Sequence, residues 1–254
     1  MIGLFQNEVT PVVVILCGAF VGGCVKGVTT MGLGLIAVPI VALFLDVQTA
    51  VLTLFASKFL SDAVMLLESR GCIPWQSTLK LAWFMLSGAI AIPAATYVLA
   101  SLSGKYLDVF LAVTILGFVV WQLSPRTPLF SSTFEHGWAA GFGAAAGASQ
   151  ALTGVGGPYT AMYLYTLRVP QSEFVFLSCV VYLLFDFSQL AAILYLDLYD
   201  RTRLTYSALT IVPVMAGTWL GVRLRRRLDP RAFRLALFTL LVASAMGLLL
   251  RAID

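Results

Sequence analysis

Charged residues are scarce in this sequence. Asp, Glu, Lys and Arg make up 11% of the 254 residues, against roughly 25% in ordinary soluble domains. Hydrophobic residues make up 60%, and the mean hydropathy is +0.94. A soluble domain would have to bury nearly all of this apolar surface, so the composition predicts an integral membrane protein whose partner is the lipid bilayer.

The residue types that carry most enzyme and metal chemistry are also few. The single histidine, His136, falls in a predicted loop, which leaves no His-based metal centre or general base. No GxxxxGK[ST] loop for nucleotide phosphates is present. We therefore predict no enzyme activity, no metal site and no cofactor. The cysteines lack metal-ligand spacing and are predicted to be packing residues: Cys17, Cys24, Cys72 and Cys179.

Apolar runs fill most of the chain. They fall at 9–28, 33–45, 48–67, 79–101, 107–124, 138–152, 155–167, 174–196, 204–222 and 233–253. The longer runs hold about 20 residues, enough for a helix to cross ~30 Å of hydrocarbon. The second and seventh runs are short, and each either spans or returns to the side that it came from. We predict an all-α polytopic membrane protein with about 8–10 membrane segments.

Each short run follows a glycine-rich break. The first break is Gly22–Pro39, and the second lies within 147–163. The motif Gly32-Leu33-Gly34 of the first break recurs 122 positions later, in the second break, as Gly154-Val155-Gly156. Three further pairs recur at 123 or 124 positions: Gln48 with Gln171, Lys58 with Tyr182, and Asp62 with Asp186. The pattern predicts two five-segment repeats, residues 1–125 and 126–254, each with a glycine-broken helix hairpin.

The loop charges predict the orientation of these repeats. Most Lys and Arg lie in one set of alternate loops, above all in Arg223–Arg234, which places that loop in the cytoplasm and both termini outside. The clustering in one loop argues against nucleic-acid binding. Since five segments is an odd number, the two repeats are predicted to be inverted. In transporters built this way, broken helices form the substrate site near the middle of the membrane.

Four ionisable residues lie inside the apolar runs or at a break: Lys26, Lys58, Asp62 and Asp186. Such residues usually face a bundle interior or a water-filled path. Lys58 and Asp62 are four positions apart and can pair on one helix face. Asp186 has no such neighbour, so it either finds a partner across the bundle or is held protonated by burial. Lys58, Asp62 and Asp186 are candidates for proton coupling, with structural pairing as the alternative.

Lys26 lies in the first break itself. Its ammonium, the hydroxyls of Thr29 and Thr30, and the free N–H groups of Gly32–Leu35 suit an oxyanion. On this interpretation Lys26 is kept for the substrate and has no buried ionic partner, whereas the alternative is that it is paired within the bundle, with Asp62 or Asp186. A second alternative is that the glycines only allow close helix crossings. The candidate substrate-binding residues are Lys26, Thr29, Thr30, Gly32 and Gly34 of the first break, and Gln150, Thr153, Gly154, Gly156 and Gly157 of the second.

These motifs resemble the sulfite exporter TauE/SafE family, also called the 4-toluenesulfonate uptake permease family. Its halves each begin with a G-x-G-G-G motif followed by V-P. Here the first copy is Gly32-Leu33-Gly34-Leu35 with Val38-Pro39, and the second is Gly154-Val155-Gly156-Gly157-Pro158 without V-P. The resemblance implies secondary transport of sulfite or an organosulfonate across the bacterial inner membrane, as export or import. An anion channel and a non-transporting membrane subunit remain the alternatives.

Overall fold

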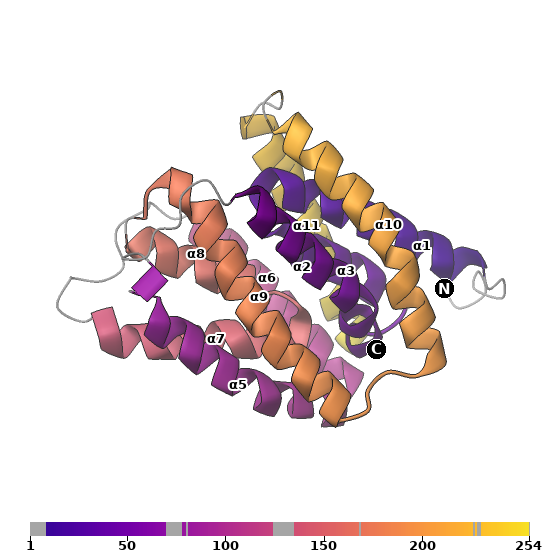
Figure 1. Cartoon of the computed structure of the whole chain (residues 1–254). Helices are drawn as coiled ribbons and strands as arrows, with labels where there is room; N and C mark the ends of the chain where they lie inside the picture. Colours follow the sequence, from indigo (N-terminus) through magenta and orange to yellow (C-terminus); the bar gives the residue numbers. More distant parts are fainter. Residues whose placement is uncertain are drawn as a thin grey trace.

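The computed structural model describes residues 9–69, 78–79, 81–123, 135–167, 169–225, 227 and 230–253. Over these residues the chain forms ten helices and no strand (Figure 1). Six of the helices are long and apolar enough to cross a membrane. The prediction of an all-α polytopic fold is therefore confirmed. The helices are α1 (Val9–Thr29), α2 (Gly32–Ala42), α3 (Val47–Glu68), α5 (Ala82–Ser101), α6 (Gly104–Leu123), α7 (Glu135–Thr153), α8 (Gly157–Thr166), α9 (Gln171–Tyr195), α10 (Arg201–Leu224) and α11 (Pro230–Ile253).

The helices fall into two series with the same order of lengths. In each series a long helix is followed by a short one and then by three long ones: α1, α2, α3, α5 and α6, then α7, α8, α9, α10 and α11. The first helix of each series ends at a break, at Thr29 and at Thr153, and these ends lie 124 positions apart. The backbone takes a positive φ directly afterwards, 71° at Thr30 and 70° at Gly154. The helix ends and the positive φ values are therefore spaced by 124 positions, the spacing that Asp62 and Asp186 have in the sequence, whereas the Gly-x-Gly motifs recur at 122.

Packing between the two series is reciprocal. The first helix of each series packs against the fourth helix of the other, as α1 with α10 and α7 with α5. The third helix of each series also packs against the fourth helix of the other, as α3 with α10 and α9 with α5. The two third helices, α3 and α9, contact each other, and so do the two fifth helices, α6 and α11. In Figure 1, α5 and α7 accordingly lie on one side of the bundle and α1 and α10 on the other. A two-fold relation between the series would produce this pattern of contacts.

Small residues bring the crossing helices into backbone contact. A Cβ added at Gly27 of α1 would lie 2.3 Å from the carbonyl oxygen of Thr218 in α10. At the equivalent crossing, a Cβ at Gly147 of α7 would lie 2.3 Å from the carbonyl oxygen of Gly88 in α5. Because lipid tails are as apolar as the helix surfaces, such close van der Waals contact supplies much of the association energy.

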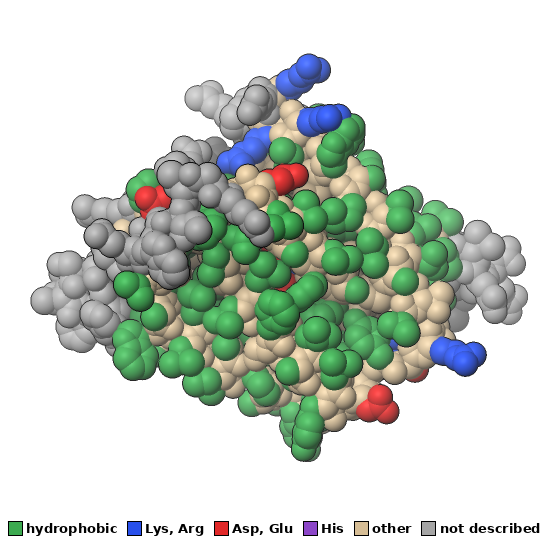
Figure 2. Space-filling model, viewed as in Figure 1, with side chains coloured by type: hydrophobic (Ala, Val, Ile, Leu, Met, Phe, Trp, Pro, Cys, Tyr) green, Lys and Arg blue, Asp and Glu red, His purple; other side chains and the backbone are tan. Residues whose placement is uncertain are grey.

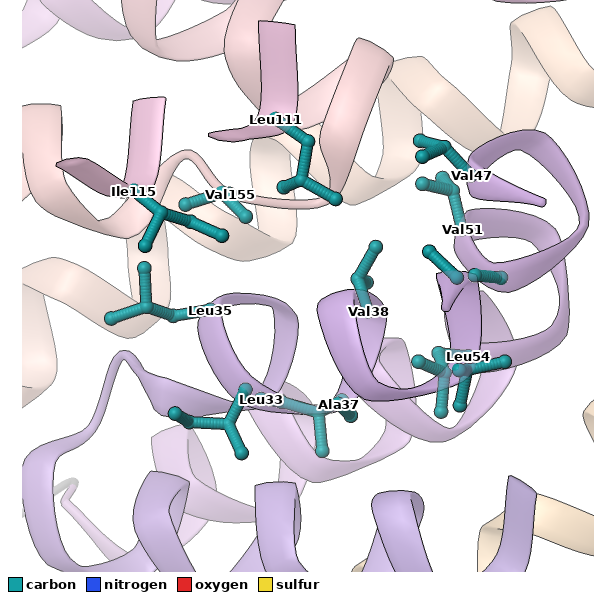
Figure 3. Packing of buried hydrophobic residues seen from close by; sticks show 14 of the residues in the cluster. Leu33, Leu35, Ala37, Val38, Val47, Val51, Leu54, Leu111, Ile115 and Val155 are labelled. Atoms are coloured by element: carbon teal, nitrogen blue, oxygen red, sulfur yellow. The ribbon is translucent and has the colours of Figure 1, made fainter. Parts of the chain in front are cut away.

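The short helix α2 is packed almost entirely in protein. Leu33, Leu35, Ala37 and Val38 are buried in one cluster with residues of α3, α6 and the second break. Figure 3 shows Leu35 beside Ile115 of α6 and Val38 beside Val51 of α3. This covering is what an eleven-residue helix at membrane depth requires, because the unpaired backbone groups at its ends are costly in lipid.

The outer surface is mostly apolar. In Figure 2 hydrophobic side chains cover most of the visible face, and most of the charged side chains lie toward its ends. Large exposed side chains include Trp83, Ile90, Val113, Val212 and Trp219. An apolar surface of this extent would favour aggregation in water, whereas it suits contact with lipid.

The two breaks cross at Gly34 and Gly154. A Cβ at Gly34 would lie 1.8 Å from the carbonyl oxygen of Gly154. We predict that Gly34→Ala forces the breaks apart and lowers the free energy of unfolding by at least ~2 kcal/mol, since the obstacle is backbone. Thermal unfolding in detergent measures this. Gly117→Ala on α6 is the control, because a Cβ there meets no atom within 4 Å. Equal melting temperatures for the two variants would contradict the crossing.

Candidate functional site

The four ionisable residues of the apolar runs come together at this crossing. Lys26 lies in the last turn of α1, Lys58 and Asp62 lie on α3, and Asp186 lies on α9. All four are buried or nearly so, with side-chain exposures of 3%, 13%, 1% and 0%. Charges at such depth persist only where they are paired and hydrogen-bonded. The contacts that satisfy them therefore define the site.

Lys26 is paired inside the bundle. Its Nζ lies 2.9 Å from Oδ1 of Asp62 and donates to Oγ of Ser61 at 2.6 Å and to the carbonyl oxygen of Lys58 at 3.3 Å. The prediction that Lys26 has no buried ionic partner is wrong. The reason is packing: the last turn of α1 ends beside the middle of α3, where Lys58, Ser61 and Asp62 share one face.

Lys58 connects the two halves of the chain. Its Nζ lies 3.6 Å from Oδ2 of Asp62, which confirms the predicted pairing along the helix. The same Nζ also forms an ion pair with Oδ1 of Asp186 on α9. Asp186 thus finds its partner across the bundle, which was one of the two predicted possibilities. A single ammonium serves two carboxylates that belong to different halves.

The spacing of 124 also relates two contacts within this network. Gln150 lies 124 positions after Lys26, and Asp186 lies 124 positions after Asp62. In the first half Lys26 Nζ lies 2.9 Å from Asp62, and in the second half Gln150 Nε2 donates to Asp186 Oδ1 at 2.9 Å. The two halves therefore build the same contact between their first and third helices. Only the charge of the donor differs.

The network has no net charge. Two lysines face two aspartates, and Gln150 and Ser61 add neutral groups. An anion that enters this network therefore has to take a lysine from an aspartate. The released carboxylate then needs either the other lysine or a proton, because an uncompensated charge at this depth is costly.

A small cavity lies at the network. It has a volume of about 20 Å³, close to the least that holds one water molecule. It is lined by Lys26, Thr30, Met31, Leu33, Gly34, Lys58, Asp62, Gln150, Gly154, Gly156, Gly157 and Tyr182. We call it the central cavity. A sulfur oxyanion needs more room, so the conformation described here is closed around the site.

Two helices begin at the central cavity. α2 begins at Gly32 and α8 at Gly157, and neither has a capping side chain. The N–H groups of an uncapped first turn carry partial positive charge and favour an anion. Three buried neutral polar atoms of the lining also have no hydrogen-bond partner among the described residues: Thr30 Oγ1, Gln150 Oε1 and the Tyr182 hydroxyl. The cavity therefore offers two ammonium groups, helix N-termini and free polar groups to a small anion.

The candidate substrate residues are not all placed alike. The central cavity is lined by Lys26, Thr30, Gly34, Gln150, Gly154, Gly156 and Gly157, whereas Thr29 and Thr153 lie outside its lining, and Gly32 is the first residue of α2. The hydroxyl of Thr29 donates to the carbonyl oxygen of Val25 at 2.9 Å, and that of Thr153 donates to Ser149 at 2.7 Å. Both hydroxyls thus satisfy the ends of their own helices. Of the coupling candidates, Lys58 and Asp62 line the cavity, and Asp186 contacts Lys58 and Gln150 from α9.

Sequence reasoning missed three residues of this site: Met31, Ser61 and Tyr182. Ser61 Oγ accepts from Lys26 and donates to the carbonyl oxygen of Lys58 at 2.9 Å. The ring of Tyr182 lies below the ammonium of Lys58, 5.8 Å from Nζ to the centroid. The equivalence of Tyr182 with Lys58 was visible in the sequence and could have indicated its place.

Fold and site together define a polytopic membrane protein whose two broken hairpins meet at a buried, charge-balanced centre. Comparison with known families agrees with this class. The family model described as "Sulfite exporter TauE/SafE" matches residues 14–248. The chain therefore belongs to the sulfite exporter TauE/SafE family, a family of membrane transporters rather than enzymes. No curated protein and no solved structure matches the chain.

The ion pair of Lys26 makes a prediction about stability. Lys26→Met leaves Asp62 with only the longer contact to Lys58, so we expect a loss of about 3 kcal/mol, the lower end for breaking a buried pair. Lys26→Gln should lose less, because Gln150 already makes the equivalent hydrogen bond to Asp186. Thermal unfolding of the purified variants tests this order. A Lys26→Met protein that melts with the parent would show that the pair adds nothing to stability.

Proposed function

We propose that this protein is a secondary transporter that carries a small sulfur oxyanion, sulfite or an organosulfonate, across the bacterial inner membrane. The observation that carries the proposal is the meeting of two ammonium groups and two uncapped helix N-termini at the central cavity. A sulfonate or sulfite group has several acceptor oxygens and at least one negative charge. Charge-assisted hydrogen bonds from lysine and backbone N–H groups are strong partners for it.

The proposed architecture is a pair of inverted repeats, residues 1–125 and 126–254, with both termini outside. The reciprocal packing of α1 with α10 and of α7 with α5 supports a two-fold relation between the halves. Arg223, Arg225 and Arg227 at the end of α10 support a cytoplasmic location for that end of the bundle. The breaks that cross at Gly34 and Gly154 would then lie where an alternating-access transporter holds its substrate.

Binding of the anion would replace an internal ion pair. The substrate takes the ammonium of Lys26 from Asp62, and the backbone around Gly34 and Gly157 supplies N–H groups. Because the central cavity is only about 20 Å³ in volume, this step requires the hairpins to separate. A carrier moves between closed conformations of this kind, whereas a channel needs a continuous path. The closed site therefore favours a carrier.

Proton coupling follows from the charge balance. When an anion occupies Lys26, the network of two lysines and two aspartates gains one negative charge. Protonation of Asp62 or Asp186 would restore neutrality, and Lys58 can turn to whichever carboxylate stays charged. Anion and proton are then expected to bind together, with proton movement linked to transport in either direction.

Transport by the purified protein tests the proposal directly. We expect proteoliposomes to take up sulfite or an organosulfonate with saturation, and Lys26→Gln to weaken binding about tenfold, the scale of one charge-assisted hydrogen bond. Lys26→Arg should keep part of the affinity, since the charge remains. Lys105→Gln, at an exposed lysine of α6, is the control. Flux without saturation would indicate a channel, and no flux with any of these anions would indicate a non-transporting component.

The coupling residues generate a separate prediction. Asp186→Asn or Asp62→Asn should reduce the stimulation of uptake by an imposed pH gradient about fivefold or more, with a smaller effect on anion binding, because a neutral amide cannot take up a proton. The control is Asp108→Asn, which changes a buried carboxylate that pairs with Arg251 at 3.7 Å, outside the lining of the central cavity. Full retention of the pH response in both neutral variants would make these carboxylates structural.

A further inference from the structure

A second cavity lies at the end of the bundle where α10 ends. Its volume is about 380 Å³, and its lining is Val28, Thr29, Thr30, Met31, Tyr165, Val169, Phe174, Val175 and Arg225. We call it the vestibule. At roughly 30 Å³ per water molecule in the liquid, it has room for an oxyanion together with several waters. The central cavity has no such room.

The vestibule adjoins the central cavity. Thr30 and Met31 line both, so two residues of the first break separate the two spaces. Thr30 is 2% exposed, its φ is 71°, and its hydroxyl has no hydrogen-bond partner among the described residues. A positive φ is strained for a β-branched residue, and such strain is kept mainly at functional sites. A buried, unpartnered hydroxyl at the boundary points to a polar ligand that passes there.

The charge of the vestibule selects the sign of that ligand. Arg225 contributes a guanidinium to the lining, and the described lining residues include no carboxylate. Glu173 precedes Phe174 in the chain but is not among the lining residues. Thr29 and Tyr165 add hydroxyl groups, while Val28, Val169, Phe174 and Val175 form apolar walls. Low-dielectric walls around a charge of one sign focus its field on small ions of the opposite sign.

We infer that the vestibule is a second anion site, the entry site on the Arg225 side, for the same small sulfur oxyanion that the central cavity takes. This inference rests on the proposed transport function. The anion is held first beside Arg225 and then passes Thr30 and Met31 to reach Lys26. In the conformation described here the vestibule has room for the anion and the central cavity does not.

Thiol labelling tests the site without any transport. Val175→Cys places a thiol on the vestibule wall, in a background where the four native cysteines are alanine. Two membrane-impermeant reagents of similar size are compared: 2-sulfonatoethyl methanethiosulfonate, an anion, and its trimethylammonioethyl analogue, a cation. We expect the anionic reagent to react at least about fivefold faster relative to its rate with free cysteine, because the vestibule concentrates anions.

The variant Arg225→Gln decides whether that preference belongs to the vestibule. It should remove most of the preference for the anionic reagent and leave the cationic rate within about twofold. Arg227→Gln is the matched control. It makes the same change two positions later in a residue that lines the outer groove of α10 beside Trp219, and its preference should stay like the parent's. Methanesulfonate, compared with chloride at equal ionic strength, should slow the anionic reagent in the parent but not in Arg225→Gln.

The outcomes separate this inference from the proposed function. Equal effects of Arg225→Gln and Arg227→Gln, or no preference for the anionic reagent, would overturn the vestibule site even if the proteoliposomes transport sulfite. A vestibule that selects anions in a protein that moves none would leave the site standing and reject transport. Labelling only from the side opposite the Arg223–Arg234 loop would also overturn the inference.

Discussion

The sharing of Lys58 between Asp62 and Asp186 is the interaction on which the rest of this structure depends. Two carboxylates buried at membrane depth require compensating charge, and the first half of the chain supplies both lysines. Lys26 satisfies the carboxylate of its own half, and Lys58 extends to the carboxylate of the other half. The electrostatic requirement therefore holds α3 against α9, and the glycine crossings let the surrounding helices approach closely enough for these contacts to form.

Packing and function make opposite demands on this centre. A buried network of two lysines and two aspartates without room for an anion is stable as it stands, whereas transport requires that it open. On the proposed function, the cost of opening would be lowered when an incoming anion and a proton take over the contacts that the ion pairs give up. The selectivity of such a site for small oxyanions would rest on this replacement, because a neutral solute cannot compensate a released lysine.

The sequence was sufficient for the helices and insufficient for their contacts. Ten apolar runs predicted the ten helices because a membrane helix must be long and apolar, and glycine breaks marked the two short ones. The sequence contains two main spacings between its halves, 122 between the Gly-x-Gly motifs and 124 between Asp62 and Asp186, and the positive φ values at Thr30 and Gly154 agree with 124. Thr30 and Gly154, which share a backbone conformation, have different side chains and gave no such signal. The partner of Lys26 lies 36 positions away on another helix, and only the packing of α1 near the middle of α3 reveals it.

The pairing of Lys26 in one half with Gln150 in the other has a consequence for any cycle that exchanges the conformations of the two halves. If the halves were chemically identical, the two end states of such an exchange would have equal energy, and neither direction of access would be preferred at rest. Here one hairpin contributes a cation to its aspartate and the other a neutral amide. In such a cycle the two end states would differ in electrostatic energy, and the empty protein would have a built-in preference for one side of the membrane.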